Sequence, residues 1–193
     1  MAWKILSAVT ISVFLTATSF ADVDKNTPGV EENASSVESL STPKDSKDQG
    51  HHAPYLLVSC MDFRLRKEVA EFMKVRAGTD TYDEFVIPGA SLGAFNENYP
   101  HWVKTFEDTV GLCIKLHSIT HVIFLDHRNC GFYKMLKGEH CCDDKDAETH
   151  VHATQFEAVR KIMKEKFPDL KVETLIMGLD GQVEEVQPET GQS

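Results

Sequence analysis

The segment 56–66, LLVSCMDFRLR, places a cysteine, an aspartate and two arginines at the end of a short apolar run. Cys60 and Arg66 have the C-x5-R spacing of a cysteine phosphatase loop. Cys60, Asp62 and Arg64 also have the spacing C-x-D-x-R, in which the sulfur would be a metal ligand. The two interpretations predict different chemistry for the same thiolate, which can act either as a nucleophile or as a ligand.

A second group of reactive side chains follows a later apolar run. The run HVIFLD (121–126) leads directly into HRNCG (127–131). The H-x-x-C spacing lets an imidazole and a thiolate turn toward one ion within a tight loop. With Cys60 as a third ligand, His127 and Cys130 would give a Cys2His set with one open position, the pattern of a catalytic zinc site. Sulfur and nitrogen ligands favour zinc over magnesium or calcium.

The phosphatase interpretation fits the sequence less well. A phosphatase loop wraps phosphate with successive backbone N–H groups and usually contains glycines that permit close approach. The segment MDFRLR has no glycine, and Asp62 would repel a phosphate dianion. The metal interpretation also accounts for His127 and Cys130, so we favour it and expect Arg66 to be an exposed helix residue.

Strands that alternate with helices must position these side chains. The predicted strands are YLLVS (55–59), EFVIPG (84–89), HVIFLD (121–126) and KVETLIMGL (171–179), and the predicted helices cover about 64–78, 101–117 and 147–167. This alternation predicts an α/β fold with a mainly parallel central sheet flanked by helices. Sites in such folds lie outside the carboxyl ends of the strands, so Cys60 and His127 should share one edge of the sheet.

The two motifs together resemble the β-class carbonic anhydrases. SCMDFR (59–64) followed by VIFLDHRNCG (122–131) is similar to that family's C-x-D-x-R, apolar strand and H-x-x-C-G, and LDGQVEEV (179–186) resembles its last strand. The resemblance runs over most of residues 55–137. It implies a β-carbonic-anhydrase-like fold and a homodimer or higher homo-oligomer. It also implies Zn2+ on Cys60, His127 and Cys130, with Asp62 and Arg64 as a neighbouring dyad.

The activity that the resemblance implies is the reversible hydration of CO2 to bicarbonate. A bound zinc ion lowers the pKa of its water to about 7, so that zinc-bound hydroxide can attack CO2 at neutral pH. Asp62 would accept a hydrogen bond from this hydroxide, and Arg64 would keep Asp62 ionised. Taken alone, the two residues could equally be a charge pair at a helix N-terminus. The candidates for carrying the released proton are His117, His121, His140, His150 and His152.

The sequence departs from the family pattern around the predicted site. Phe63 and Arg128 replace residues that are commonly serine, Asp126 replaces a common glycine, and IPGAS (87–91) stands in place of R-x-A-G-N. The expected pocket is lined by a partner subunit and by Phe63, Phe85 and Ile87. Because these changes affect the pocket, two alternatives remain: hydrolysis of a related small molecule such as COS or CS2, and zinc binding without catalysis.

The cysteines outside the motif have several interpretations. The chain has five cysteines, so at least one is unpaired or is a ligand. A disulfide between Cys60 and Cys130 is the structural alternative to the metal site. Cys113 lies on the apolar stripe of a predicted helix and is expected in the core. Cys141 and Cys142 could be redox-active, bridge two chains, hold a second metal or be an ordinary loop pair.

The N-terminal segment predicts the location of the protein, and the net charge limits its possible partners. Residues 1–21 have a positive start, an apolar run of 14 residues and small residues before the end, which predicts a signal peptide. We therefore expect an exported protein, periplasmic or secreted, with no stable membrane insertion after cleavage. Residues 22–52 are polar and acidic and are expected to be a disordered linker or arm, followed by a zinc domain at 53–193. The net charge of −10 argues against nucleic acid as a partner.

Overall fold

The computed structural model describes residues 51–78 and 81–186. The predicted signal peptide and residues 22–50 of the predicted arm lie outside the described residues, so both stay predictions. The elements in chain order are β1 (Tyr55–Ser59), η1 (Phe63–Leu65), α1 (Arg66–Arg76), β2 (Tyr82–Val86), α2 (Ser91–Ala94), α3 (Pro100–His117), β3 (His121–His127), α4 (Gly131–Lys137), η2 (Glu139–Cys142), α5 (Lys145–Lys166), β4 (Lys171–Met177) and β5 (Val183–Glu185).

A five-stranded sheet with the order β2-β1-β3-β4-β5 forms the centre of this part of the chain. The strands β2, β1, β3 and β4 are parallel, and only β5 runs antiparallel, beside β4. The α/β fold with a mainly parallel sheet is therefore confirmed. β5 lies within the segment that resembles the last strand of the family.

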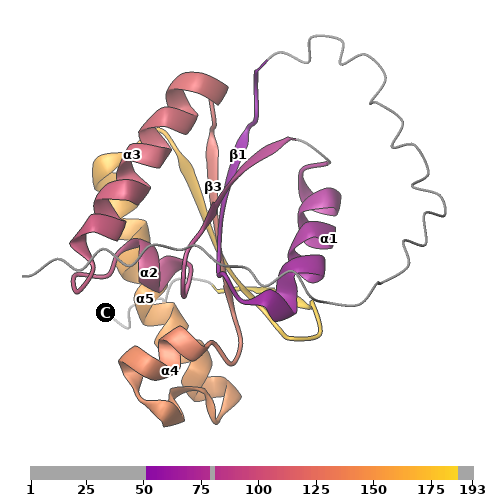
Figure 1. The fold of residues 1–193 in the computed structure, drawn as a ribbon, viewed down its shortest axis with the longest axis vertical. Helices are drawn as coiled ribbons and strands as arrows, with labels where there is room; N and C mark the ends of the chain where they lie inside the picture. Colours follow the sequence, from indigo (N-terminus) through magenta and orange to yellow (C-terminus); the bar gives the residue numbers. More distant parts are fainter. Residues whose placement is uncertain (1–50, 79–80, 187–193) are drawn as a thin grey trace, which may run out of the picture. The chain divides into compact units, whose positions relative to one another are not determined.

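Helices cover both faces of the sheet (Figure 1). Side chains of a strand alternate between the faces, so Leu56 and Val58 pack with α3 and α5, whereas Leu57 packs with Met73 of α1. Phe106 of α3 is fully buried in the first of these cores. Burial on both faces explains why β1 and β3 appear in the sequence as continuous apolar runs. Among the described residues, no helix combines the length and the apolar character that crossing a membrane requires.

The predicted elements match the structure except at short connections. The second strand is shifted from the predicted 84–89 to Tyr82–Val86, and the chain turns after it. The helices α2 and α4 have 4 and 7 residues, too few for an apolar period to indicate them in the sequence. Cys113 is buried in the core on α3, as its place on the apolar stripe predicted.

Candidate metal centre

The predicted metal ligands meet at the carboxyl edge of the sheet. β1 and β3 are neighbours and pair Ser59 with Leu125, so Cys60 and His127 leave adjacent strand ends. Cys130 occupies the position before α4, close to the end of β3. The possible ligand atoms of Cys60, His127 and Cys130 all lie within 4.8 Å of one another. This cluster could bind a metal ion, as the spacing of the two motifs predicted.

His127 presents its Nε2 atom to this cluster. Its Nδ1 lies 2.9 Å from the carbonyl oxygen of Arg128, a contact in which Nδ1–H donates. Nε2 is buried and has no hydrogen-bond partner in the described part of the chain. A backbone carbonyl on one ring nitrogen fixes the tautomer in which the other nitrogen carries the lone pair. The buried lone pair of His127 Nε2 could be satisfied by coordination to a metal ion.

The protonation of the Cys60 and Cys130 thiols also favours binding of a cation. A hydrogen bond from Cys130 lowers the pKa of the Cys60 thiol to about 4, against the opposing influence of burial. The backbone N–H of Gly89 donates to Cys60 Sγ at 3.3 Å. The adjacent Cys60 thiolate, together with burial, raises the pKa of Cys130. One sulfur is thus already anionic, and a soft divalent ion would draw the proton from the other.

Asp62 and Arg64 form the predicted dyad beside the cluster. Arg64 Nε donates to Asp62 Oδ1 at 2.9 Å and Nη2 donates to Asp62 Oδ2 at 2.6 Å. These hydrogen bonds lower the pKa of the Asp62 carboxyl to about 2, so it is ionised at neutral pH. Asp62 Oδ2 lies 3.8 Å from His127 Nε2, and Arg64 Nη2 also donates to the Asn129 carbonyl at 3.1 Å. Asp62 also caps the short helix η1, so the charge-pair and dyad interpretations both apply.

Two departures from the family pattern contact each other. The Asp126 carboxylate accepts hydrogen bonds from the backbone N–H of Ser91 at 2.9 Å and from its hydroxyl at 2.7 Å. Tyr133 donates to the same carboxylate at 2.6 Å, and His152 Nδ1 lies 2.9 Å from it. All four side chains are buried. Ser91 of the changed loop 87–91 therefore supplies hydrogen bonds to the carboxylate that Asp126 introduces. His152 is fully buried, so it has no access to solvent for proton transfer.

A third departure, Arg128, belongs to a contact that the sequence did not indicate. Glu148 at the start of α5 is only 4% exposed, and it accepts a hydrogen bond from the Asn129 backbone N–H at 2.6 Å. Arg128 Nη1 lies 3.4 Å from the same carboxylate. Asn129 has a φ of 55°, which is the left-handed conformation that asparagine tolerates. Glu148 therefore fixes the turn between His127 and Cys130 from another helix.

The pocket beside the sulfurs differs from the expected one. A cavity of about 290 Å³ is lined by Cys60, Met61, Asp62, Pro88, Cys130, Gly131, Phe132 and Met135. Phe63, Phe85 and Ile87, which were predicted to line the pocket together with a partner subunit, do not line this cavity of the single chain. Phe63 is 81% exposed, whereas Phe85 packs on Phe106 and Ile87 is buried in the core. The short helix η1 turns Phe63 outward, a direction that the sequence did not reveal.

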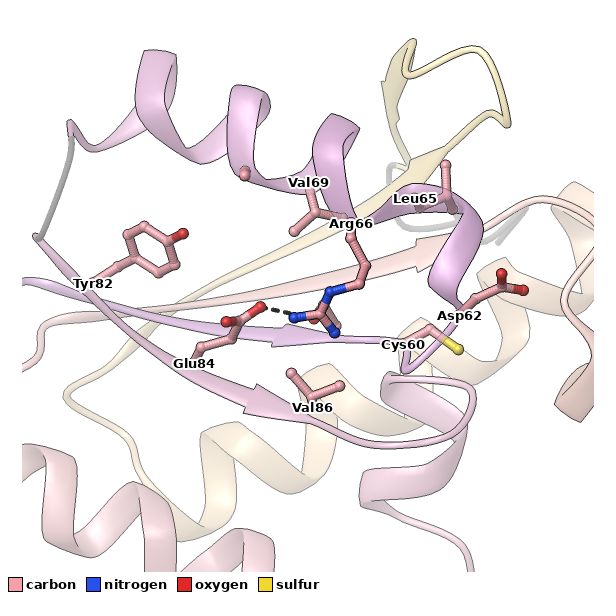
Figure 2. Close-up of a pocket in the computed structure, with 10 residues that line it drawn as sticks. Cys60, Asp62, Leu65, Arg66, Val69, Tyr82, Glu84 and Val86 are labelled. Atoms are coloured by element: carbon pink, nitrogen blue, oxygen red, sulfur yellow. Dashed lines mark hydrogen bonds between the residues drawn. The ribbon is translucent and has the colours of Figure 1, made fainter. Parts of the chain in front are cut away.

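A second hollow lies on the other side of Cys60, between α1 and the edge strand β2. It has a volume of about 110 Å³, and Figure 2 shows Arg66, Glu84 and Val86 among its lining residues. Arg66 is exposed at the start of α1, as the metal interpretation expected.

Comparisons with known proteins agree with the geometry of the site. The family described as "Putative carbonic anhydrase" matches residues 51–187. An uncharacterised protein of Rickettsia bellii (strain RML369-C) is 48% identical over 136 residues, which are 70% of this chain and 83% of the relative. An uncharacterised protein of Rickettsia conorii (strain ATCC VR-613 / Malish 7) is 47% identical over 136 residues, 70% of this chain and 73% of the relative.

Among solved structures, the crystal structure of carbonic anhydrase from Streptococcus mutans is 17% identical, with a TM-score of 0.43 over 71% of this chain and 84% of that chain. The family match covers the whole described sheet and every residue of the candidate metal centre. The chain therefore belongs to the family described as "Putative carbonic anhydrase".

Proposed function

We propose that this protein is a zinc-dependent carbonic anhydrase that interconverts CO2 and bicarbonate. The observation that carries the proposal is the convergence of Cys60, His127 and Cys130 beside the Asp62–Arg64 dyad in a chain of this family. Two thiolates and one neutral imidazole are a ligand set that suits zinc. When bound there, zinc would supply a Lewis acid that makes water nucleophilic at neutral pH.

The residues of the dyad would orient the reacting water. Asp62 is ionised and can only accept hydrogen bonds, so it would hold the water by one of its hydrogens and direct the oxygen lone pair toward CO2. Arg64 fixes the carboxylate with two hydrogen bonds. Because Arg64 also binds the Asn129 carbonyl, it connects the dyad to the loop that carries His127 and Cys130. This connection would keep the orienting group and the metal ligands in one arrangement.

The cavity beside the sulfurs suits an apolar substrate. Met61, Pro88, Phe132 and Met135 supply an apolar wall, and the charged Asp62 lies at one side. An uncharged molecule such as CO2 loses little hydration on entering such a space, whereas a charged product gains by leaving it. The wall therefore favours entry of CO2 and release of bicarbonate.

The experiment that tests the proposal combines two measurements on one purified sample of the chain. CO2 hydration is measured by stopped flow, and zinc is quantified in the same protein. We expect about one zinc per chain and catalysis, with both lost in Cys130→Ala and both kept in the control Cys113→Ala. Bound zinc without CO2 hydration between pH of about 6.5 and about 9 would contradict the proposal. Hydrolysis of COS or CS2 by that sample would support the alternative chemistry, and a Cys60–Cys130 disulfide without metal would contradict the metal site itself.

Assembly and location form part of the same proposal. The resemblance in sequence supports a homo-oligomer, which light scattering on the purified protein would test. The predicted signal peptide at 1–21 supports export. N-terminal sequencing of the mature protein, expected to begin at Asp22, would test that prediction.

A further inference from the structure

A second pair of sulfur atoms lies outside the candidate metal centre. Cys141 and Cys142 follow each other at the end of η2, and their Sγ atoms are 2.9 Å apart. Both side chains are half-buried and pack against a buried cluster formed by Leu92, Cys130 and Tyr133. The proposed reaction uses neither thiol.

The surroundings leave this pair open to a small reagent. Residues 137–140 on one side and 143–147 on the other are exposed. Acidic side chains predominate in this segment, with Glu139, Asp143, Asp144 and Asp146 close in the sequence. A neutral or cationic reagent would therefore approach the two sulfurs more readily than an anionic one.

We propose that Cys141 and Cys142 form a second reactive site, a dithiol that exchanges with a small external disulfide and closes to a vicinal disulfide. In the first step the Cys141 thiolate attacks the external disulfide R–S–S–R, forms a mixed disulfide and releases RS⁻. The Cys142 sulfur then attacks Cys141 Sγ, forms the bond between the two cysteines and releases the second RS⁻. The protein loses two electrons and two protons, and the external disulfide becomes two molecules of RSH.

The order of the two steps follows from the contacts of Cys142. Burial, the neighbouring Cys141 and a hydrogen bond to Glu148 raise the pKa of the Cys142 thiol. A thiol that is held protonated reacts slowly with an external disulfide, because the thiolate is the nucleophile. Once Cys141 carries the mixed disulfide, however, the adjacent Cys142 attacks it within the molecule, where its effective concentration is high.

Glu148 connects the dithiol to the metal loop. This buried carboxylate is close enough to the Cys142 thiol to raise its pKa, and it accepts a hydrogen bond from the Asn129 backbone N–H at 2.6 Å. Formation of the disulfide removes the Cys142 thiol proton from the neighbourhood of Glu148, whose carboxylate keeps its contact with Arg128. The oxidation state of the pair therefore acts on the turn between His127 and Cys130. Any effect on catalysis rests on the proposed function, whereas the exchange chemistry does not.

Mass spectrometry tests the exchange on the zinc-loaded chain, whose metal ligands are then protected. The probe is 2-hydroxyethyl disulfide, which is small and neutral. Trypsin releases residues 138–145, GEHCCDDK, a peptide that holds Cys141 and Cys142 and no other cysteine. We expect this peptide to lose two hydrogens and to retain no hydroxyethylthio group. Two free thiols after treatment, or adducts that persist on the wild-type peptide, would overturn the proposal.

A matched variant separates the two steps and tests the connection through Glu148. Cys142→Ser keeps a small polar side chain near Glu148 but cannot close the disulfide, so Cys141 should retain one hydroxyethylthio group. The amide signal of Asn129, followed by NMR, should shift when the wild-type pair is oxidised and stay in place in treated Cys142→Ser. An unmoved Asn129 signal in the oxidised wild-type chain would refute the connection to the metal loop. Neither readout depends on CO2 hydration, so failure of the proposed function would not be mistaken for failure of this site.

Discussion

The substitution Tyr133→Phe removes one hydrogen-bond donor from the buried Asp126 carboxylate, together with the 3.2 Å contact between the Tyr133 and Ser91 hydroxyls. The Tyr133 hydroxyl donates to Asp126 Oδ2 at 2.6 Å, and both side chains are buried. The aromatic ring remains in the variant, so no large cavity forms. The carboxylate keeps its two hydrogen bonds from Ser91 and its contact with His152. The variant therefore measures mainly the charge-assisted hydrogen bond to Asp126, together with the longer contact to Ser91.

A hydrogen bond to a charged group contributes about 1.5–3 kcal/mol to stability. Because Asp126 retains other donors, we expect a loss near the middle of this range, about 2 kcal/mol in the free energy of unfolding. For a domain of this size, that loss lowers Tm by about 4–8 °C. Ser91→Ala removes a donor from the same oxygen atom, Oδ2. The effects of the two substitutions should therefore differ from additivity by about 0.5 kcal/mol or more.

Urea denaturation of the zinc-loaded chain measures these changes, with Tyr99→Phe as the matched control. The Tyr99 ring stacks on Trp102 at 4.2 Å, and its hydroxyl has no hydrogen-bond partner among the described residues. We expect this control to change the free energy of unfolding by less than about 0.5 kcal/mol. Equal stability of Tyr133→Phe and Tyr99→Phe would refute a stabilising hydrogen bond from Tyr133 to Asp126.

Three further substitutions test the dyad, the turn and the thiols. Arg64→Gln should raise the pKa of Asp62 from about 2 toward its ordinary value. Because the carboxylate is then no longer oriented, kcat/KM for CO2 hydration in stopped flow should fall by about 10²-fold. The control Arg76→Gln, the same charge change at the far end of α1, should leave kcat/KM unchanged. Glu148→Gln should lower the free energy of unfolding in urea by about 1–3 kcal/mol, since the turn loses a buried charged acceptor; an unchanged value would contradict that role. Cys113→Ala should keep its zinc and lose about 1 kcal/mol of stability, because this thiol is only a core side chain, whereas loss of zinc would assign it a role at the metal.

The sequence was sufficient to predict the sheet and the meeting of Cys60, His127 and Cys130 at its edge, for a physical reason. Strands buried on both faces appear as continuous apolar runs, and Cys60 and His127 follow directly at their ends. The hydrogen bonds between loops that are distant in the sequence have no such pattern in the sequence. The pairing of Asp126 with Ser91 spans 35 residues, and that of Asn129 with Glu148 joins a loop to a helix. Such contacts depend on how the loops pack on one another, which neither spacing nor periodicity contains.

The chain separation of the ligands determines how metal supply affects folding. His127 and Cys130 are three residues apart in the sequence, whereas Cys60 is brought to them by the pairing of β1 with β3. The completed site exists only in the folded chain, so the free energy of metal binding adds to the free energy of folding. Above saturation, each tenfold rise in free zinc would then stabilise the fold by about 1.4 kcal/mol. If the site holds the proposed zinc, surroundings poor in zinc would therefore leave less of this protein in the folded form.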